Sequence, residues 1–198
     1  MGARAELLGL PGSGKSTYCD SEQIDLPVHR ADQASSMFRV GWFFMGAISY
    51  FRIFILSFQT IYHVPHRYFY LHLLAIFRLF SRIYEVERLV GRKNVVLEEG
   101  IYQAVWGLFM LVEENSSTRL MLSKIVNKLT LAKTHVIYIV ADKELVIKRN
   151  ILRDKPNRFL LLIQRDEKEL VESSIKWMDL LMIQLKKNNL VNKIVHNG

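Results

Sequence analysis

A glycine-rich stretch near the start of the chain constrains the fold more than any other feature. Residues 9–17 read GLPGSGKST, and all fixed positions of the pattern G-x-x-x-x-G-K-[ST] are filled, by Gly9, Gly14, Lys15 and Ser16. Glycines let successive backbone N–H groups turn inward around phosphate oxygens. The lysine ammonium can reach the β- and γ-phosphates, and the serine hydroxyl can ligate Mg²⁺. The pattern therefore predicts a loop that binds a nucleoside triphosphate.

The residues on either side of this loop fit the same interpretation. Residues 5–8 form a short apolar run typical of a buried strand, and the residues from 15 to 22 read as the start of a helix. The positive N-terminal end of that helix would add to the attraction for phosphate. Cys19, the single cysteine of the chain, is interpreted as a small apolar residue of this helix. We therefore expect a strand, a phosphate-binding loop and a helix in succession.

The rest of the chain alternates short apolar runs with helical patterns. Such alternation predicts an α/β fold in which helices cover both faces of a parallel sheet. Further strands are expected at residues 27–29, 94–100, 134–142 and 190–196. Helical patterns cover residues 31–90 with a break at 63–66, residues 101–130 with a break near 113–117, and residues 143–152 and 163–188.

The apolar run at residues 94–97 ends in two carboxylates. Glu98 follows it directly, so we expect this side chain at the carboxyl edge of the sheet beside the phosphates. There it can accept a proton or hold a water molecule on Mg²⁺. Glu99 would point the other way if the strand continues, which favours Glu98 as the functional carboxylate. Tyr102 and Gln103 then either face an acceptor or lie on a helix surface.

With the basic segment KRNILRDKPNR at residues 148–158, these features make the chain resemble the nucleoside and nucleotide kinase group of P-loop proteins. Thymidylate kinase-like and deoxynucleoside kinase-like members are similar in layout. The resemblance implies a P-loop NTPase three-layer αβα sandwich, in which the carboxylate strand lies beside the strand before the glycine-rich loop. It also implies ATP and Mg²⁺ as cofactors and phosphoryl transfer to a small-molecule acceptor. Many members carry aspartate where this chain has Glu98, so the roles of its two carboxylates stay open.

The motif and the resemblance together predict three sets of site residues. The catalytic set is Lys15, Glu98, Arg149 and Arg153. The nucleotide-binding set is Gly9, Leu10, Pro11, Gly12, Ser13, Gly14, Lys15, Ser16, Thr17 and Arg158. The Mg²⁺ ligands are Ser16 and Glu98.

The segment at about residues 148–160 resembles the lid that closes over the triphosphate in these kinases. Arg149 and Arg153 are four residues apart, so a helix would carry both on one face. Pro156 should end that helix, with Arg158 in the loop beyond it. A solvated basic helix is the alternative.

The stretch at about residues 30–90 is a helical insertion within a single domain of residues 1–198. Residues 29–83 hold six arginines, four histidines, fourteen aromatic residues, no lysine and one acid, Asp32. The resemblance makes this lobe the acceptor lid, whose arginines hold an acceptor phosphate. Ordinary core packing of the aromatic residues is an alternative. The candidate arginines are Arg30, Arg39, Arg52 and Arg67.

Contact with a membrane is a third interpretation of this lobe. Between Val40 and Tyr62 the only charged residue is Arg52, over a length sufficient to cross a bilayer. The central arginine and two glycines oppose insertion, which favours a buried or surface-lying helix. Further along, Arg78, Arg82 and Glu85 share one stripe of an amphipathic helix, to which we assign a structural role.

Charge and motifs narrow the function classes. The chain has 27 basic and 19 acidic residues, a net charge of +8, which can attract nucleic acid, anionic lipid or phosphorylated molecules. Arginines spread through an apolar lobe make a poor track for nucleic acid, which is not an expected partner. Glycines and Lys15 occupy the positions near the N-terminus where a signal peptide would have its apolar segment. A cytoplasmic location is therefore expected. A nucleotide-binding regulatory or membrane-peripheral protein is the alternative to a kinase, and a homodimer stays open.

Overall fold

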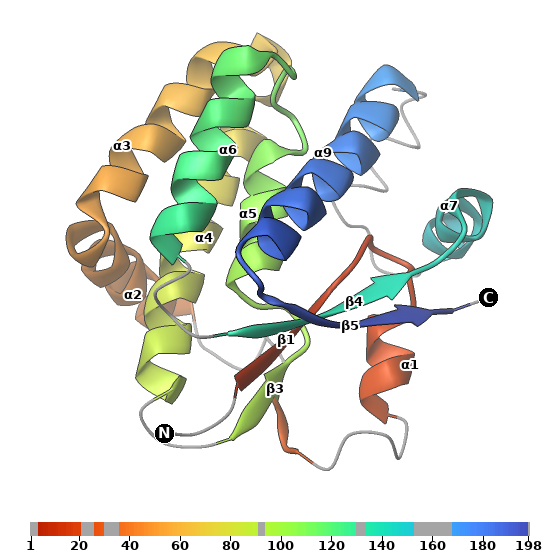
Figure 1. The fold of residues 1–198 in the computed structure, drawn as a ribbon. Helices are drawn as coiled ribbons and strands as arrows, with labels where there is room; N and C mark the ends of the chain where they lie inside the picture. Colours follow the sequence, from red (N-terminus) through yellow and green to blue (C-terminus); the bar gives the residue numbers. More distant parts are fainter. Residues whose placement is uncertain are drawn as a thin grey trace.

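The computed structural model of the chain describes residues 4–20, 26–29, 36–90, 94–129, 134–152 and 168–197. Five strands in these residues form one sheet in the order β2-β3-β1-β4-β5, and every neighbouring pair is parallel (Figure 1). The predicted parallel five-stranded sheet, with the carboxylate strand beside the strand before the glycine-rich loop, is confirmed. The strands are β1 (Arg4–Leu8), β2 (Val28–His29), β3 (Val95–Leu97), β4 (His135–Val140) and β5 (Val191–His196).

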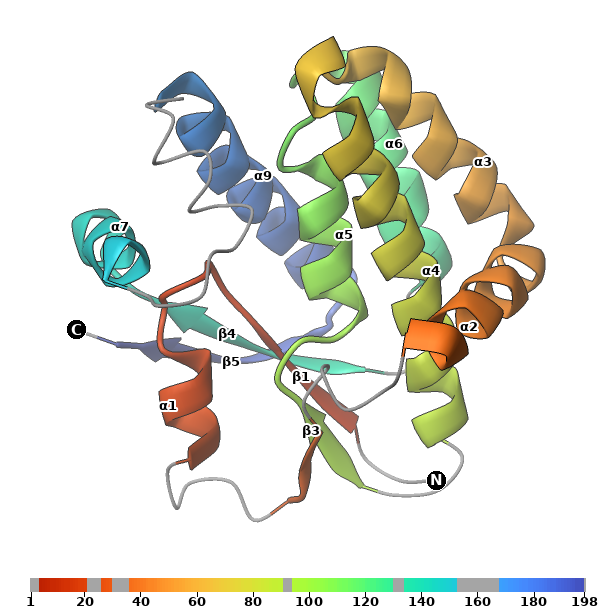
Figure 2. The ribbon, with the colours of Figure 1, turned by 180° about the vertical axis from the view of Figure 1, so that it is seen from behind.

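Helices lie on both faces of the sheet, an arrangement compatible with three layers. Figures 1 and 2 show α1 against one face, and α5, α6 and α9 over the other, with α2, α3 and α4 beside them. The breaks expected at residues 63–66 and near 113–117 lie where the chain passes from α3 to α4 and from α5 to α6, although Ser116 already belongs to α6. The helices are α1 (Lys15–Asp20), α2 (Ser36–Ser49), α3 (Phe51–Gln59), α4 (Phe69–Val90), α5 (Ile101–Phe109), α6 (Ser116–Leu129), α7 (Lys143–Ile151) and α9 (Lys168–Lys187), with the 3₁₀ helices η2 (Thr60–His63) and η3 (His66–Tyr68).

Strand β1 separates two apolar clusters, because successive side chains point to opposite faces of a sheet. Leu8 belongs to the large cluster shared with α4, α5, α6 and α9. Leu7 belongs to a small cluster with Val96 and with Cys19 of α1. The cysteine is buried, as expected for a small apolar residue. Both faces of β1 are therefore covered, as is typical of a central parallel strand.

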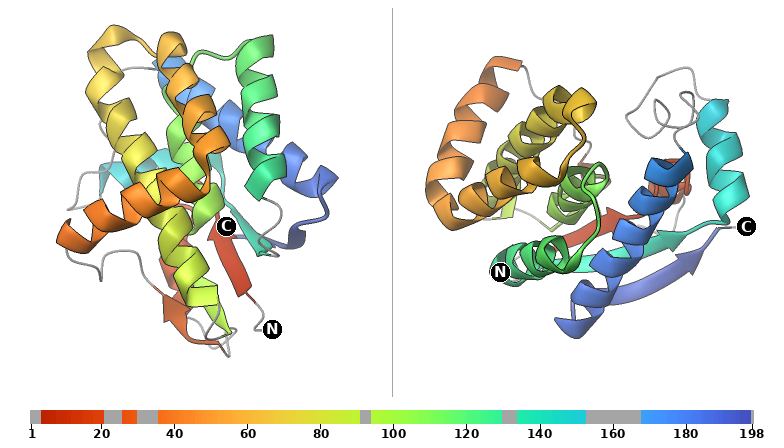
Figure 3. Two further views of the ribbon diagram at one scale, coloured as in Figure 1. Left: turned by 90° about the vertical axis from the view of Figure 1, so that its left-hand side faces the viewer. Right: turned by 90° about the horizontal axis from the view of Figure 1, so that it is seen from above.

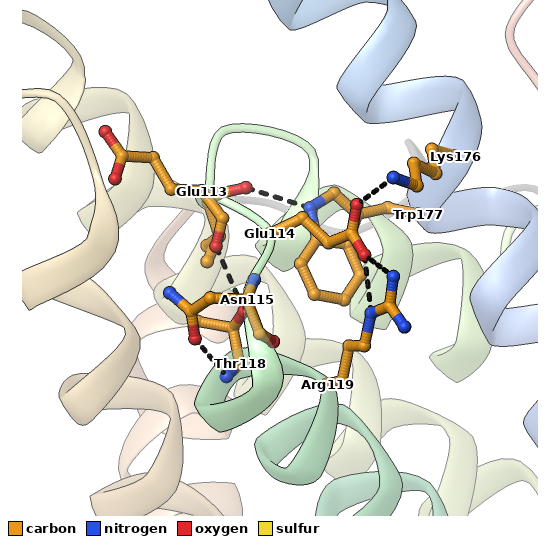
Figure 4. Close-up of polar contacts among 8 residues, drawn as sticks. Glu113, Glu114, Asn115, Thr118, Arg119, Lys176 and Trp177 are labelled. Carbon is orange, nitrogen blue, oxygen red and sulfur yellow. Dashed lines mark hydrogen bonds and ion pairs between the residues drawn. The ribbon is translucent and has the colours of Figure 1, made fainter.

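Side chains from α6 and α9 organise the connection between α5 and α6 (Figure 4). Asn115 Oδ1 accepts a hydrogen bond from the Thr118 backbone N–H at 3.0 Å, an N-terminal cap for α6. Glu114 forms ion pairs with Arg119 of α6 and Lys176 of α9. The Trp177 indole N–H donates to the Val112 carbonyl at 2.8 Å. These contacts join α5, α6 and α9 at one end of the helical layer.

The insertion between β2 and β3 packs through a close helix crossing. A Cβ on Gly46 of α2 would overlap the Phe80 carbonyl oxygen of α4, so glycine allows the two backbones to approach. Phe43 stacks on Phe77, with ring centroids 5.1 Å apart, and also meets the rings of Phe54 and Phe80. Part of the aromatic content is therefore core. Within the described ranges no single helix is long and apolar enough to cross a membrane, although α2 and α3 together pass that test with a 100° bend.

A buried carboxylate in β1 joins the sheet to α5. Glu6 is fully buried, and its Oε1 accepts a hydrogen bond from the Gln103 backbone N–H at 2.8 Å. A Cβ on Gly100 would overlap this carboxyl group, so glycine is required there for space. Burial raises the pKa of Glu6 to about 7, against the lowering effect of the amide hydrogen bonds and Arg4.

We predict that Glu6→Gln flattens the pH dependence of stability. Between the ordinary pKa of 4.5 and the folded value of about 7, the folded state keeps a proton that the unfolded chain has lost. Raising the pH through this window should therefore lower the free energy of unfolding by about 3 kcal/mol in the original chain. Urea denaturation across the window measures this slope, with Glu172→Gln, at an exposed carboxylate, as the control. An unchanged slope in Glu6→Gln would show that another group is responsible.

Candidate functional site

A cavity of about 420 Å³ lies at the carboxyl edge of β1 and β3. Parallel pairing of the two strands brings the glycine-rich loop and the Glu98 segment to this edge. Three helices complete the wall. The lining residues are Pro11, Gly12, Gly14, Lys15, Ser16 and Thr17 from the loop and α1, Glu98, Glu99 and Gly100 after β3, Arg78 and Arg82 from α4, Gln103, Ala104, Trp106, Gly107 and Met110 from α5 and its C-terminal end, and Arg149 from α7.

The loop has a backbone conformation that depends on its glycines. Gly12 and Gly14 have φ angles of 86° and 92°, in the region that residues with a Cβ rarely adopt. At Gly9 the limit is space, because a Cβ would lie 2.6 Å from the Ile139 carbonyl oxygen. The glycines of the sequence motif are therefore needed for the shape of the loop. Gly9, Leu10 and Ser13 do not belong to the cavity lining themselves.

The ammonium group of Lys15 lies within the curve of the loop. Lys15 Nζ donates hydrogen bonds to the carbonyl oxygens of Gly9 at 2.7 Å and Leu10 at 3.1 Å. The residue is only 9% exposed, yet it lines the cavity. The positive charge is therefore held at the cavity wall by the backbone of the loop that precedes it.

The two carboxylates after β3 both reach the cavity, with different partners. Ser16 Oγ donates a hydrogen bond to Glu98 Oε1, which brings the predicted Mg²⁺ ligands into contact. Glu99 forms an ion pair with Arg78 at 3.0 Å. The expectation that Glu99 points away from the site is wrong, because β3 ends at Leu97 and the side chains beyond it no longer alternate between faces.

Gln103 connects the loop to β1. Its side-chain Oε1 accepts a hydrogen bond from the Gly9 N–H at 3.3 Å, while its backbone N–H donates to Glu6. Gln103 is buried and lines the cavity, whereas Tyr102 is buried in the core. Neither residue lies on a helix surface.

Polar side chains from two other elements hold the loop in place. Asn150 Nδ2 of α7 donates to the Pro11 carbonyl at 2.6 Å, and Arg149 Nη1 to the Gly12 carbonyl at 3.4 Å. Asn197, directly after β5, donates to the Ser13 carbonyl at 2.9 Å. Neither asparagine belongs to the glycine-rich motif or to the predicted site residues. A polar residue four positions after Val146, on the buried side of α7, is the signal that would have found Asn150.

The predicted lid falls partly outside the described residues. Arg149 lies in α7, whose N-cap is Asp142, and the Asp142 Oδ1 accepts a hydrogen bond from the Glu144 N–H at 2.8 Å. Arg149 also lines the cavity. Arg153 and Arg158 lie in a part of the chain that the structure does not describe, so their predicted roles stay predictions.

The arginines that line the cavity differ from those expected. Arg78 and Arg82 of α4 belong to the wall, whereas Arg39, Arg52 and Arg67 do not, and Arg30 is outside the described residues. Arg78 and Arg82, for which the sequence predicted only a structural role, therefore also belong to the candidate site.

A buried ion pair holds Arg82 in the wall. Arg82 Nη1 lies 2.5 Å from Glu85 Oε2, and the other carboxylate oxygen of Glu85 lies 2.8 Å from His29 Nε2. Burial lowers the pKa of Arg82, and the Glu85 charge counteracts this effect. Arg82 and Glu85, two of the three residues predicted on one stripe of this helix, are both buried, where α4 lies against the end of β2.

Comparison with known proteins does not assign the chain to a family. No protein-family model matches the sequence, and no curated protein sequence matches it. The residues of the cavity are therefore the basis for assigning a function.

We predict that Asn150→Ala destabilises the domain by about 1–3 kcal/mol, the range for leaving a buried hydrogen-bonding group without its partner. The alanine would remove the bond to the Pro11 carbonyl beside Gly12. Thermal and urea unfolding measure the loss. Asn192→Ala, at an exposed residue of β5, is the control and should change stability little. Equal effects of the two substitutions would contradict a special role for the bond to the loop.

Proposed function

We propose that the chain is a Mg²⁺-dependent kinase, similar to P-loop nucleoside and nucleotide kinases, that transfers the γ-phosphoryl group of ATP to a small-molecule acceptor. The acceptor class is nucleotide-, nucleoside- or sugar-like. The observation that carries the proposal is the contact between Ser16 and Glu98 inside one cavity. It joins the residue after the lysine of the motif to a carboxylate of the neighbouring parallel strand.

The glycine-rich loop fits the phosphates of a nucleoside triphosphate. Its conformation requires glycine at positions 12 and 14, and added Cβ atoms would overlap the side chains that hold the loop. The backbone of such a loop can present N–H groups to phosphate oxygens. Lys15 would exchange its bonds to the carbonyls of Gly9 and Leu10 for phosphate oxygens.

Ser16 and Glu98 provide a hydroxyl and a carboxylate, the hard oxygen donors that Mg²⁺ prefers. These two residues would hold Mg²⁺, which when bound neutralises charge on the phosphate oxygens. Glu98 can alternatively accept the proton of the acceptor hydroxyl. Lys15 and Arg149, which line the same cavity, would stabilise negative charge on the transferring group.

The opposite wall supports an acceptor site. Arg78 and Arg82 offer guanidinium groups, and Trp106 and Met110 offer apolar surface to a ring. These groups are of the kinds that would contact a second, phosphorylated or ring-containing molecule beside the nucleotide, which a protein that only binds a nucleotide would not hold. This difference favours a kinase over a regulatory protein without an acceptor.

The direct test is ADP formation by the purified chain with ATP, Mg²⁺ and a panel of nucleosides, nucleotides and sugars. A kinase should form ADP faster with at least one acceptor and yield the phosphorylated acceptor by mass spectrometry. A slow rate that no acceptor changes would support the regulatory alternative and contradict the kinase proposal.

Lys15→Ala should abolish phosphoryl transfer, because it removes a charge that stabilises the transition state. Circular dichroism and thermal unfolding should show a folded protein, since the substitution lies at the cavity wall. Lys193→Ala, at an exposed residue of β5, is the control and should keep its turnover. Unchanged turnover in Lys15→Ala would remove the kinase assignment.

Glu98→Gln should slow the chemical step by about 10²-fold or more, the range for losing a general base. Glu99→Gln should have a much smaller effect, because its carboxylate pairs with Arg78 and does not contact Ser16 in the structure. Single-turnover kinetics of the two variants separates the chemical step from binding. A larger loss in Glu99→Gln would reverse the assignment of the two carboxylates.

A further inference from the structure

The outward sides of α2 and α3 are apolar and exposed. On α3, Phe51, Ile55 and Phe58 are spaced by four and three residues, so they form one stripe along the helix. Tyr62 continues it in the next turn and is 88% exposed. On α2, Phe44 and Ile48 are also exposed. We call these six residues the outer apolar surface: Phe44, Ile48, Phe51, Ile55, Phe58 and Tyr62.

This surface is unusual for a helix on the outside of a domain, whose solvent side is normally polar. The two helices face the viewer in the left view of Figure 3, on the side of the molecule away from α7. An apolar patch of this extent marks an interaction site.

The opposite sides of the same helices are buried in the domain. Ile53 and Ser57 of α3 are buried, and Gly46 of α2 lies against the backbone of α4. The 100° bend between α2 and α3 also breaks the only pair of helices in the described ranges with the length and composition of a membrane span. The outer apolar surface can therefore lie on a bilayer, while crossing it would require the core to open.

The charged residues around the outer apolar surface indicate what kind of partner binds there. Residues 36–84 contain no aspartate or glutamate, whereas Arg39, Arg52 and Arg67 flank or interrupt the surface. In the described part of the chain, two acidic residues of other elements contact the ends of α3 and η2: Tyr50, at the bend, donates a hydrogen bond to the Glu87 carboxylate, and the Glu113 backbone N–H donates to the His63 carbonyl. An apolar surface with a positive border fits the interface of a bilayer with anionic headgroups.

A second copy of the chain fits this surface less well. In a two-fold symmetric dimer the same patch meets itself, which would bring the arginines of both copies together. Nucleic acid would match the positive charge, but it would leave the phenylalanines without an apolar partner.

We propose that the outer apolar surface binds bilayers that contain anionic phospholipid, with α2 and α3 lying in the headgroup region. The cavity of the domain would then be held beside the membrane. This inference is independent of the proposed kinase activity, because it concerns a different face and its test measures lipid binding alone.

The test is flotation of the full chain with vesicles of phosphatidylcholine, with or without about 30 mol% phosphatidylglycerol. Binding should be at least about tenfold stronger to the anionic vesicles and should weaken several-fold at about 0.5 M salt. Failure to bind either vesicle, or equal binding to both, would overturn the proposal.

A matched pair of substitutions locates the binding surface. Ile55→Ser should lower vesicle binding about fivefold or more, and the double variant Phe51→Ser/Ile55→Ser further still. Ile183→Ser, at an exposed isoleucine of α9, should leave binding unchanged. Equal losses at the two isoleucines would overturn the assignment of the surface.

Sedimentation velocity of the same proteins tests the competing occupant. The proposal expects a species whose mass does not depend on concentration. The original chain could instead form a dimer that is lost in the Phe51→Ser/Ile55→Ser variant. If lipid binding were also absent, the outer apolar surface would be assigned to a second copy of the chain.

Discussion

The parallel pairing of β1 with β3 is the constraint on which the site depends. It brings the loop that follows Leu8 and the carboxylates that follow Leu97 to one edge of the sheet. Because parallel strands need a long connection, the chain between β1 and β3 includes α4, which lines the cavity together with α5 and α7. Gln103 then joins the two segments, since its side chain accepts from Gly9 and its backbone donates to Glu6.

The same edge concentrates buried polar groups, which are costly unless they are hydrogen-bonded. The loop carbonyls of Pro11 and Ser13 are satisfied by Asn150 and Asn197, from elements far away in the sequence. Glu6 is also fully buried, and burial raises the pKa of its carboxyl group. Its carboxyl group connects β1 to the start of α5 through the hydrogen bond from the Gln103 backbone N–H. The shape of the loop is thus a property of the whole α/β layer.

Local patterns predicted most of the fold but only part of the site. The strands and the glycine-rich loop follow from runs of apolar residues and from φ requirements, both of which are local. The contact between Ser16 and Glu98 follows from the strand order that the family resemblance implies. Arg78 and Arg82 were recognised as one stripe of a helix, yet periodicity cannot say whether that stripe faces water or a cavity. Glu99 was misplaced because the end of β3 is set by tertiary packing.

Helix α4 gives the two proposed surfaces a fixed geometry. One of its sides carries Arg78 and Arg82 into the cavity, while Phe77 and Phe80 pack against α2. Close approach of the backbones at Gly46 leaves little freedom for α2 to move on α4. A bilayer bound to α2 and α3, as proposed, would therefore also orient the wall of the cavity that carries Arg78 and Arg82. With a bilayer bound as proposed, the helical insertion would do more than cover the sheet, because it would set the direction in which the cavity faces relative to the membrane.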